Sequence, residues 1–302
     1  MHRMKNKVAK KVSLSLFFIP AIIPMIIFVI FPILQTIYMS FLSPNGEFVG
    51  LNNYLEVLNE KNPQFAIVNL EGFPRFPPWG ALIHNLVWIA IHLPITTFFG
   101  LALAIILRDV KGASIIKSVI FLGMVMPMIV GGIIIRFMFT EGVGIVNGFF
   151  DLIGLKGLTK TWVTYPDTAL FALIFGSVWL WTGFSLILYS AGLAAIPKDF
   201  YEAAKMDGAS PLRTFFRITL PLLKPVTIVV IAMTILWELK IFDLVYMATM
   251  GGPGSSSNVL ALTMYIYWAY GLDYIRASVV AVLLTILTLV IAVWLIRYLV
   301  RR

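Results

Sequence analysis

The residues of this 302-residue chain that could do chemistry are few, and their spacing argues against an enzyme. There is no cysteine, which excludes disulfides and thiol chemistry, and there are only three histidines and 14 dispersed acids. His84 and His92 stand eight residues apart and lack a convincing third metal ligand. No G-x4-G-K-[ST] phosphate loop occurs, so the chain lacks that device for holding ATP. We therefore expect no catalytic residue, no metal site and no cofactor on this chain.

The most explicit local signals lie in one polar stretch, IPKDFYEAAKMDGASPLRTFFRITLPLLKP. Asp199 and Glu202 have the spacing of a capping box, which predicts a helix starting near position 200. Asp207 and Gly208 permit a sharp reversal, because glycine tolerates positive φ. Ser210 is then positioned to cap a second helix, with a proline at its first position. Pro221 and Pro225 are expected to end that helix.

A helix this short is marginal alone in water, so it needs a packing partner. Small residues and a pair of acids suit it to a groove on another protein. The alternative, an ordinary interfacial loop, stays open at this point.

A second group of polar residues lies close together further along the chain. Thr234 and Glu238 are one helical turn apart, while Lys240 and Asp243 point to an adjacent face. Such residues within an apolar stretch are costly and usually face a cavity or a partner. In one interpretation Thr234 and Glu238 line a solute path, while Lys240 and Asp243 pair with each other or with a second subunit. In the other, Glu238, Lys240 and Asp243 form only a structural ion pair at a subunit interface.

Composition identifies the solvent that the chain must face. Its residues are 60% hydrophobic and 12% charged, with a mean hydropathy of +0.94. A soluble domain carries roughly a quarter charged residues, so most of this surface must face lipid. The net charge of +9 would suggest nucleic acid in a soluble protein, but here the basic residues flank apolar segments and indicate membrane topology instead.

We predict a single all-α membrane domain, 1–302, with six transmembrane helices. About 20 apolar residues cross a bilayer core. The predicted spans are 14–38, 86–107, 119–137, 169–193, 226–250 and 277–295, with a cytoplasmic tail at 1–13 and a polar segment at 198–221. The first run is too long for a signal peptide and is read as a retained span. Val226–Trp237 is too short to cross, so the fifth span is continued through Glu238, Lys240 and Asp243. The 43–80 loop has the pattern of a small exposed cap, and Val259–Tyr270 that of a half-buried or interfacial helix.

The distribution of lysine and arginine predicts the orientation. With the N-terminus inside, 16 of the 23 basic residues are cytoplasmic and four lie in outer loops, namely Lys61, Arg75, Lys156 and Lys160. Cytoplasmic loops carry the excess of basic residues, so both termini are expected inside a cell membrane.

The polar segment resembles the EAA motif of binding-protein-dependent ABC importer permeases, EAA–x2–DGA–x5–F–x2–I–x–LP. The matching residues are Glu202, Ala203, Ala204, Asp207, Gly208, Ala209, Phe215, Ile218, Leu220 and Pro221. FVGLNNY at 48–54, AGLAAIP at 191–197 and FDLVYMATMGGP at 242–253 resemble the carbohydrate branch of that family, similar to the maltose and multiple-sugar permeases. The family more often reads T-x-GGP or T-GGGP before that last proline.

The resemblance implies a type I importer permease fold with a cytoplasmic coupling helix that docks on an ATPase. It also implies the partners: a second permease subunit, expected to form a heterodimer, two ATPase copies that carry ATP and magnesium, and an external solute-binding protein that delivers a sugar. In this family the solute contacts lie on the spans that flank the motif. The corresponding candidates here are Ser177, Trp181, Phe184, Thr234, Glu238 and Lys240.

Two further readings stay open. A sister permease could import glycerol-3-phosphate, with Lys240 holding the phosphate. A free-standing secondary transporter would show inverted repeats and broken helices in matching halves, and no such repeat stands out.

Overall fold

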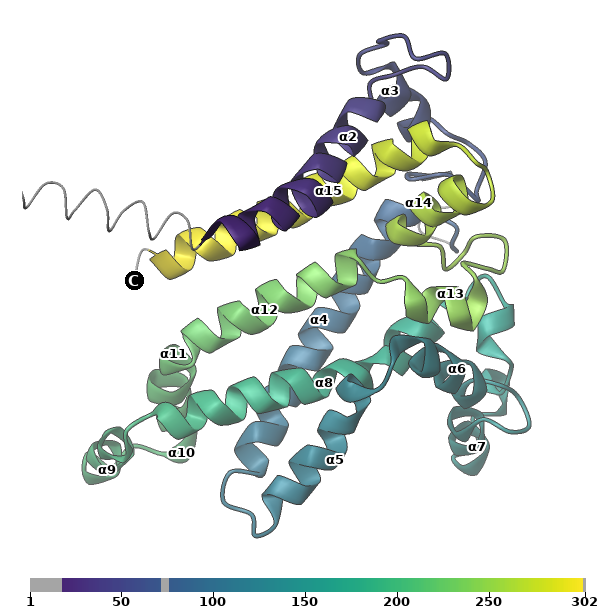
Figure 1. The fold of residues 1–302 in the computed structure, drawn as a ribbon. Coiled ribbons are helices and arrows are strands. Elements are labelled where there is room, and N and C mark those ends of the chain that lie inside the picture. The colour runs from purple at the N-terminus through teal and green to yellow at the C-terminus, as the bar shows by residue number, and fades with distance from the viewer. Residues whose placement is uncertain (1–17, 72–75, 301–302) are drawn as a thin grey trace, which may run out of the picture.

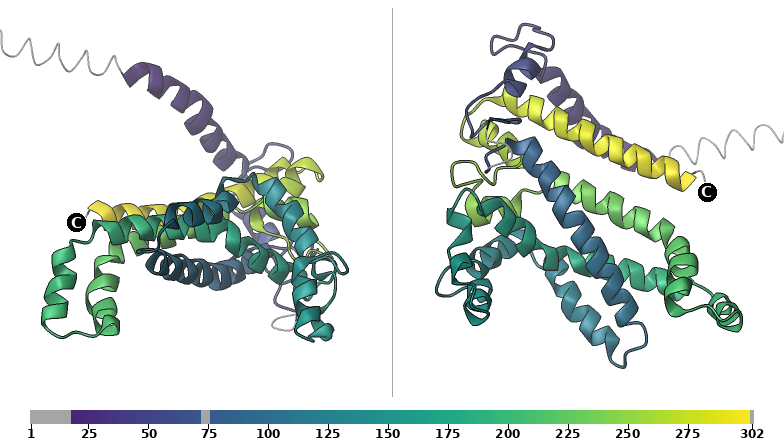
Figure 2. Two further views of the ribbon diagram at one scale, coloured as in Figure 1. Left: turned by 90° about the horizontal axis from the view of Figure 1, so that it is seen from below. Right: turned by 180° about the vertical axis from the view of Figure 1, so that it is seen from behind.

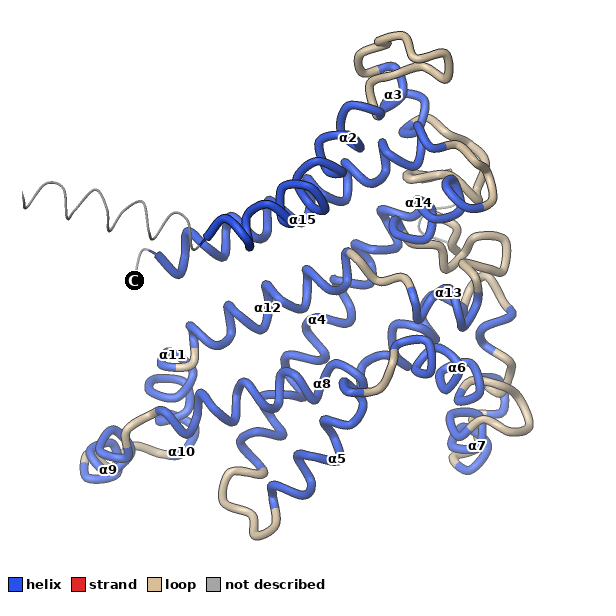
Figure 3. The backbone as a smooth tube through the Cα atoms, viewed as in Figure 1, coloured by secondary structure: helices blue, strands red, loops and turns tan. Residues whose placement is uncertain are grey.

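The computed structural model describes residues 18–71 and 76–300. Within these ranges the regular structure is helical, apart from one isolated antiparallel bridge between Leu42 and Phe48 (Figures 1 and 3). The first described helix covers Phe18–Met39, includes a π-helical turn at Ile26–Ile30, and ends as α2, Phe31–Met39. The later helices are α3 (Asn52–Leu58), α4 (Ala81–Ile106), α5 (Ala113–Val125), α6 (Met128–Met138), α7 (Ile145–Leu152), α8 (Ala169–Ala195), α9 (Lys198–Met206), α10 (Pro211–Thr214), α11 (Leu220–Leu222), α12 (Lys224–Leu239), α13 (Asp243–Thr249), α14 (Leu260–Ala269) and α15 (Tyr274–Val300).

α8 is the central helix of the bundle. It packs against α4 and α5 and also touches α6, α12 and α13, and 67% of its most apolar stretch is buried, against 22% for α4. α15 contacts α2, α3, α12 and α14 instead. It lies at the edge of the bundle (Figure 1), and the first helix diverges from it when the molecule is seen from below (Figure 2). The two ends of the bundle differ: α3, α13 and α14 lie at one end, and α9 lies at the other (Figure 1).

The structure supports a multi-span membrane protein. Four helices are long and apolar enough to cross a bilayer: Phe18–Met39, α4, α8 and α15. Two bent pairs bring the count to as many as six, so the predicted number is the upper end of the range that the described residues allow. The predicted start of the first span at residue 14, the basic N-terminal tail, Arg75 and the last two arginines lie outside the described residues.

The expected continuous helix over 119–137 is broken in the structure. α5 and α6 meet at an angle of 101° around Met126 and Pro127. Proline disfavours the helical conformation of the residue before it, and Met126 is extended, with φ −69° and ψ 138°. Hydropathy alone therefore did not predict this bend, which Pro127 imposes on an otherwise apolar run.

The expected helix over 226–250 is also broken. α12 ends at Leu239, and α13 begins four residues later at Asp243. The side-chain amide of Asn85 on α4 donates to the carbonyl of Glu238 at 2.8 Å. In a continuing helix this carbonyl would accept from the backbone four residues on, so Asn85 satisfies a group that the break leaves open. Continuing the span as one helix through its charged residues was therefore wrong.

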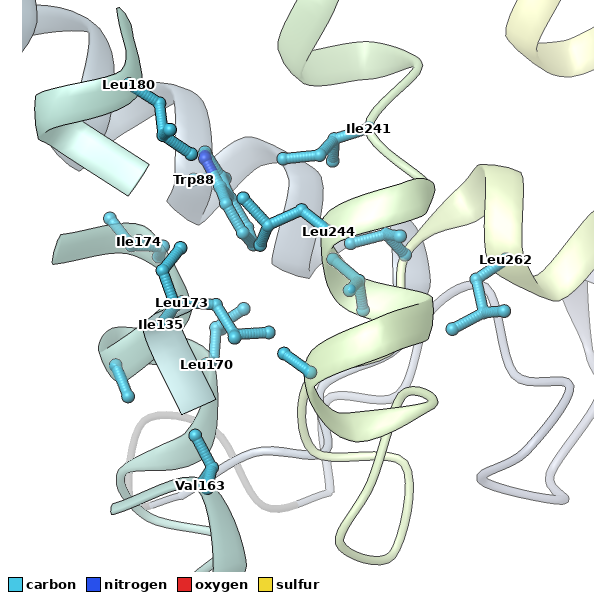
Figure 4. Close-up of a cluster of buried hydrophobic side chains, with 14 of the residues drawn as sticks. Trp88, Ile135, Val163, Leu170, Leu173, Ile174, Leu180, Ile241, Leu244 and Leu262 are labelled. Carbon is cyan, nitrogen blue, oxygen red and sulfur yellow. The ribbon is translucent and has the colours of Figure 1, made fainter. Parts of the chain in front are cut away.

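The region that follows the GGPGSSSN loop agrees with the prediction of a short helix. α14 buries Leu260, Leu262, Thr263, Ile266 and Tyr267, whereas Trp268 at its end is 53% exposed. The main apolar core lies between α4, α6, α8 and α13, and Figure 4 shows Trp88, Leu173, Leu180 and Leu244 meeting there.

Small residues allow α4 and α8 to approach each other closely. A Cβ added to Gly100 on α4 would lie 2.2 Å from Cβ of Ser185 and 2.9 Å from the backbone nitrogen of Leu186. Gly148 on α7 is the opposite case, with no atom within 4 Å of its added Cβ.

We expect Gly100→Ala to destabilise the protein by about 1–3 kcal/mol, since the neighbouring backbone cannot yield. Gly148→Ala is the matched control and should be neutral or slightly stabilising, because alanine favours a helix over glycine. The measurement is the temperature at which half of the detergent-solubilised chain is lost from its monodisperse size-exclusion peak. Equal midpoints for the two variants would show that the α4–α8 contact tolerates the methyl group.

Candidate functional site

The segment that carries the motif folds into two short helices joined by a tight turn. α9 begins at Lys198, with Pro197 at its N-cap, and no side-chain cap is made there. The expected capping box of Asp199 and Glu202 is therefore wrong: Asp199 lies inside the first turn, where a negative charge favours the helix N-terminus. The expected turn is present, since Gly208 has φ +68°.

The second helix starts as the sequence indicates. The Ser210 side chain accepts a hydrogen bond from the backbone N–H of Arg213 at 3.3 Å, and Pro211 follows at the first position. A π-helical turn at Phe215–Thr219 and the short α11 lead to a bend of 63° before α12. Pro221 and Pro225 lie on either side of this bend. The helical path therefore turns between them and continues as α12.

Half of the motif residues face outward. The exposed ones are Glu202, Ala203, Asp207, Gly208 and Pro221, whereas Ala209, Phe215, Ile218 and Leu220 are half-buried and Ala204 is buried against the rest of the chain. The Glu202 carboxylate has no hydrogen bond or ion pair within the described part of the chain. The exposed residues are thus available to another protein.

Tyr201 fastens α9 to the bundle. The Arg108 guanidinium lies 4.7 Å above its ring, and the Thr219 hydroxyl donates to its OH group at 3.3 Å. Arg108 follows α4 and Thr219 precedes α11, so three separate parts of the chain converge on one ring. This contact holds α9 in a defined orientation.

Large apolar side chains are exposed around the segment. Met206 is 89% exposed, and Phe200, Leu212 and Phe216 are exposed as well. Apolar side chains gathered beside polar motif residues are typical of a protein interaction site. This arrangement is unlike that of a solvated loop.

A second candidate site is a pocket of about 250 Å³ near the break between α12 and α13. Trp181 and Trp237 form one wall, and Lys240 and Asp243 contribute opposite charges. Other residues on the wall are Met124, Met128, Ile241, Phe242 and Leu244. Aromatic faces beside a few polar groups suit a ligand with both C–H surface and hydroxyls.

The structure brings some of the predicted path residues to this pocket and buries others. Trp181 and Lys240 line it, and Phe184 packs edge-on against Trp237 with ring centroids 4.6 Å apart. Ser177 is buried and donates to the carbonyl of Ile174. Thr234 and Glu238 are also buried and do not line the pocket. Their role toward a solute stays a prediction.

Glu238 has a partner that the sequence did not reveal. Its Oε1 lies 2.5 Å from Nδ1 of His92 on α4, and both side chains are fully buried. The suggested ion pair among Glu238, Lys240 and Asp243 is not formed: within residues 18–71 and 76–300, Lys240 and Asp243 are exposed without an ion-pair partner.

The His92–Glu238 pair is surrounded by unused polar atoms. Nε2 of His92, Oε2 of Glu238, Nε1 of Trp181 and Oγ1 of Thr234 are buried without a hydrogen-bond partner in the described structure. The His92 ring meets Trp181 edge-on at 5.6 Å, so Trp181 separates this polar group from the pocket.

His92, Asn85 and Trp237 are the site residues that sequence reasoning missed. A signal for the first two was present, because a histidine and an asparagine seven residues apart share one face of a helix in an apolar stretch. No sequence spacing identified Glu238, 146 residues away, as the partner.

Comparisons with known proteins agree on one family. The profile described as "Binding-protein-dependent transport system inner membrane component" matches residues 96–302. A probable ABC transporter permease protein of Pyrococcus horikoshii is 59% identical over 284 residues, 93% of this chain and 96% of that protein. A trehalose/maltose transport system permease protein of Thermococcus litoralis is 31% identical over 280 residues, 91% of this chain and 89% of that protein.

The fold is also similar to that of a solved structure. A chain from a bacterial ABC transporter involved in the import of the acidic polysaccharide alginate superposes with a TM-score of 0.80 at 20% identity. The match covers 99% of each chain. It supports the predicted permease fold over the whole length.

The buried pair leads to a prediction about stability. His92→Leu should cost about 3 kcal/mol, because it leaves the Glu238 carboxyl buried and unpaired. The double variant His92→Leu/Glu238→Leu should recover most of this loss, since apolar replacement of a buried pair is often neutral. The measurement is again the thermal midpoint in detergent, with the exposed Lys240→Gln as the control. If the double variant were as unstable as the single one, the pairing would not be what stabilises this contact.

Proposed function

Because the chain belongs to the binding-protein-dependent transport system inner membrane components, we propose that it is the membrane-spanning subunit of an ATP-driven importer for a sugar or oligosaccharide. The main support for this proposal is the α9–α10 segment. Five of the motif residues are exposed, and the contacts of Tyr201 hold the segment against the bundle. The chain is a transporter component and forms or breaks no covalent bond.

The α9–α10 segment is the proposed docking site for an ATPase subunit. Glu202, Asp207 and the exposed Met206 face away from the bundle, while Ala204 and Tyr201 face it. ATP and magnesium would be held by two copies of that partner, and its closure would push on α9. The bend of 63° then passes the movement to α12.

A second permease subunit would complete the solute path, and we expect it to be a different chain. Lys240 and Asp243 are exposed in the isolated chain although they lie next to an apolar helix, and charges in such a place need an aqueous path or a partner. The solute would be delivered at the α14 end by an external binding protein. Alternating access between the two ends would then move it inward.

The pocket favours a neutral, hydroxyl-rich solute. Trp181 and Trp237 offer ring faces to the C–H surface of a sugar, and Lys240 and Asp243 can bond to hydroxyls. A phosphate dianion would meet Asp243 as well as Lys240, which disfavours glycerol-3-phosphate. The relative named for trehalose/maltose transport supports a sugar as the solute.

We propose that the α9 end of the bundle faces the cytoplasm, with both termini on that side of the cell membrane. The supporting observation is the concentration of basic residues at this end, including Lys198, Lys205, Arg213 and Arg217. The ATPase needs cytoplasmic ATP, so the docking segment has to lie there.

Glu202→Ala tests the docking assignment without disturbing the fold, since this side chain is exposed and unpaired within the described structure. We expect uptake to fall by roughly tenfold or more, which is the fold-change that a typical coupling free energy between two sites produces. Co-purification of the ATPase should weaken in parallel. Gly208→Ala should act in the same direction, because its φ of +68° costs an alanine about 1–2 kcal/mol. Lys198→Ala, exposed on the same helix but outside the motif, is the matched control. Wild-type uptake and wild-type ATPase retention in both motif variants would overturn the assignment.

The orientation has a clean test because the chain contains no cysteine. Single-cysteine variants Gly157→Cys, in the loop after α7, and Lys111→Cys, in the loop after α4, place a thiol at opposite ends of the bundle. A membrane-impermeant maleimide applied to intact cells should label the first and spare the second until the cells are broken. The reverse pattern would contradict the proposed topology.

A further inference from the structure

A large pocket lies between the motif segment and the ends of two spans, away from the solute pocket. Its volume is about 530 Å³, and it is bordered by the last turns of α4 and α8 and by α9 and α10. Ile105, Leu193 and Phe215 form its apolar wall. Since α4 and α8 end here, the pocket lies at the level of the lipid headgroups.

The charges that line this pocket are positive. Arg108 and Lys205 are among its lining residues, and none of the described residues on its wall is acidic. Neither cation forms an ion pair within the described ranges. Two unpaired cations on one wall create a site for an anion.

The geometry leaves donors free to bind such an anion. The Arg108 guanidinium carbon lies 4.7 Å from the centroid of the Tyr201 ring, and its N–H groups form no hydrogen bond with the described residues. The Tyr201 OH accepts from Thr219, and its own proton is therefore available to a ligand. The Thr214 side chain also lines the pocket.

We propose that this pocket binds the phosphate headgroup of an anionic phospholipid. Basic pockets between transmembrane helices on the cytoplasmic side are suited to such headgroups. Arg108 and Lys205 would hold the phosphate, and the wall of Ile105, Leu193 and Phe215 would contact the start of the acyl chains. A soluble phosphate would satisfy the cations but leave this apolar wall uncovered.

The bound lipid would brace the coupling segment. Lys205 lies on α9 and Arg108 directly after α4, so one headgroup would join α9 to the bundle beside the Tyr201 contact. This consequence rests on the proposed function, whereas the binding itself depends only on the pocket.

The test is a binding titration on the full-length chain in a neutral detergent, without the ATPase. Phosphatidylglycerol and phosphatidylcholine are titrated separately, and retained lipid is measured by native mass spectrometry. Arg108→Gln/Lys205→Gln removes the two pocket cations. Lys111→Gln/Lys198→Gln is the matched control, because it removes two exposed cations from the same loop and the same helix outside the pocket.

We expect the wild-type chain to prefer phosphatidylglycerol over phosphatidylcholine, and the pocket variant to bind phosphatidylglycerol roughly tenfold or more weakly, given two lost headgroup contacts. The control variant should stay within about twofold of wild type. Equal affinity for the two lipids, or equal losses in both double variants, would overturn the proposal. Displacement of the lipid by millimolar inorganic phosphate would also overturn it, since the pocket would then be a site for small anions. ATPase retention and uptake are separate readouts, so a failed lipid test leaves the proposed function standing.

Discussion

A helix that breaks inside a bilayer must have its free backbone groups bound by other parts of the protein, and this constraint organises the structure. The side chain of Asn85 on α4 satisfies this requirement at the break after α12. Its amide nitrogen donates to the carbonyl of Glu238, and its oxygen accepts from the N–H of Leu260 at the start of α14. His84 adds a second link, since its ring bonds to the carbonyl of Asn258 and accepts from the N–H of Trp79. α4 therefore holds together segments that are more than 150 residues away in sequence.

The hydrogen bonds of Asn85 fix the end of α12 that lies beside the pocket. The helix runs from the bend at the motif segment to Leu239, a rise of about 24 Å for its 16 residues. Trp237 and Lys240 lie at the C-terminal end of α12, and the motif segment adjoins its N-terminal end. A single helix thus links the two candidate sites. Asn85 and the His92–Glu238 pair anchor the end of this helix that lies beside the pocket.

The features that could be predicted from sequence are those that depend on residues close together in the chain. Ser210 caps its helix and Gly208 makes its turn because both effects act over three or four residues. Apolar length identified α8 and α15, with α8 ending two residues later than predicted. The capping box at Asp199 failed because Pro197 already occupied the N-cap, so a competing local signal decided where α9 begins.

The breaks and the buried pair could not be predicted, because they depend on contacts between distant helices. In the fifth span the apolar run ends at Trp237, but the group that satisfies the backbone at the break lies on α4, in the amide of Asn85, and no local pattern indicates it. Glu238 was expected to line a path because a carboxylate in an apolar helix needs a polar neighbour. That argument was sound, but it did not specify which neighbour. His92 fills that role on one carboxylate oxygen, and the other oxygen, with Nε2 of the same histidine, is left without a partner in the described structure. The pair therefore joins α4 to α12 through a single hydrogen bond, and a contact of this kind between distant residues leaves no local pattern in the sequence.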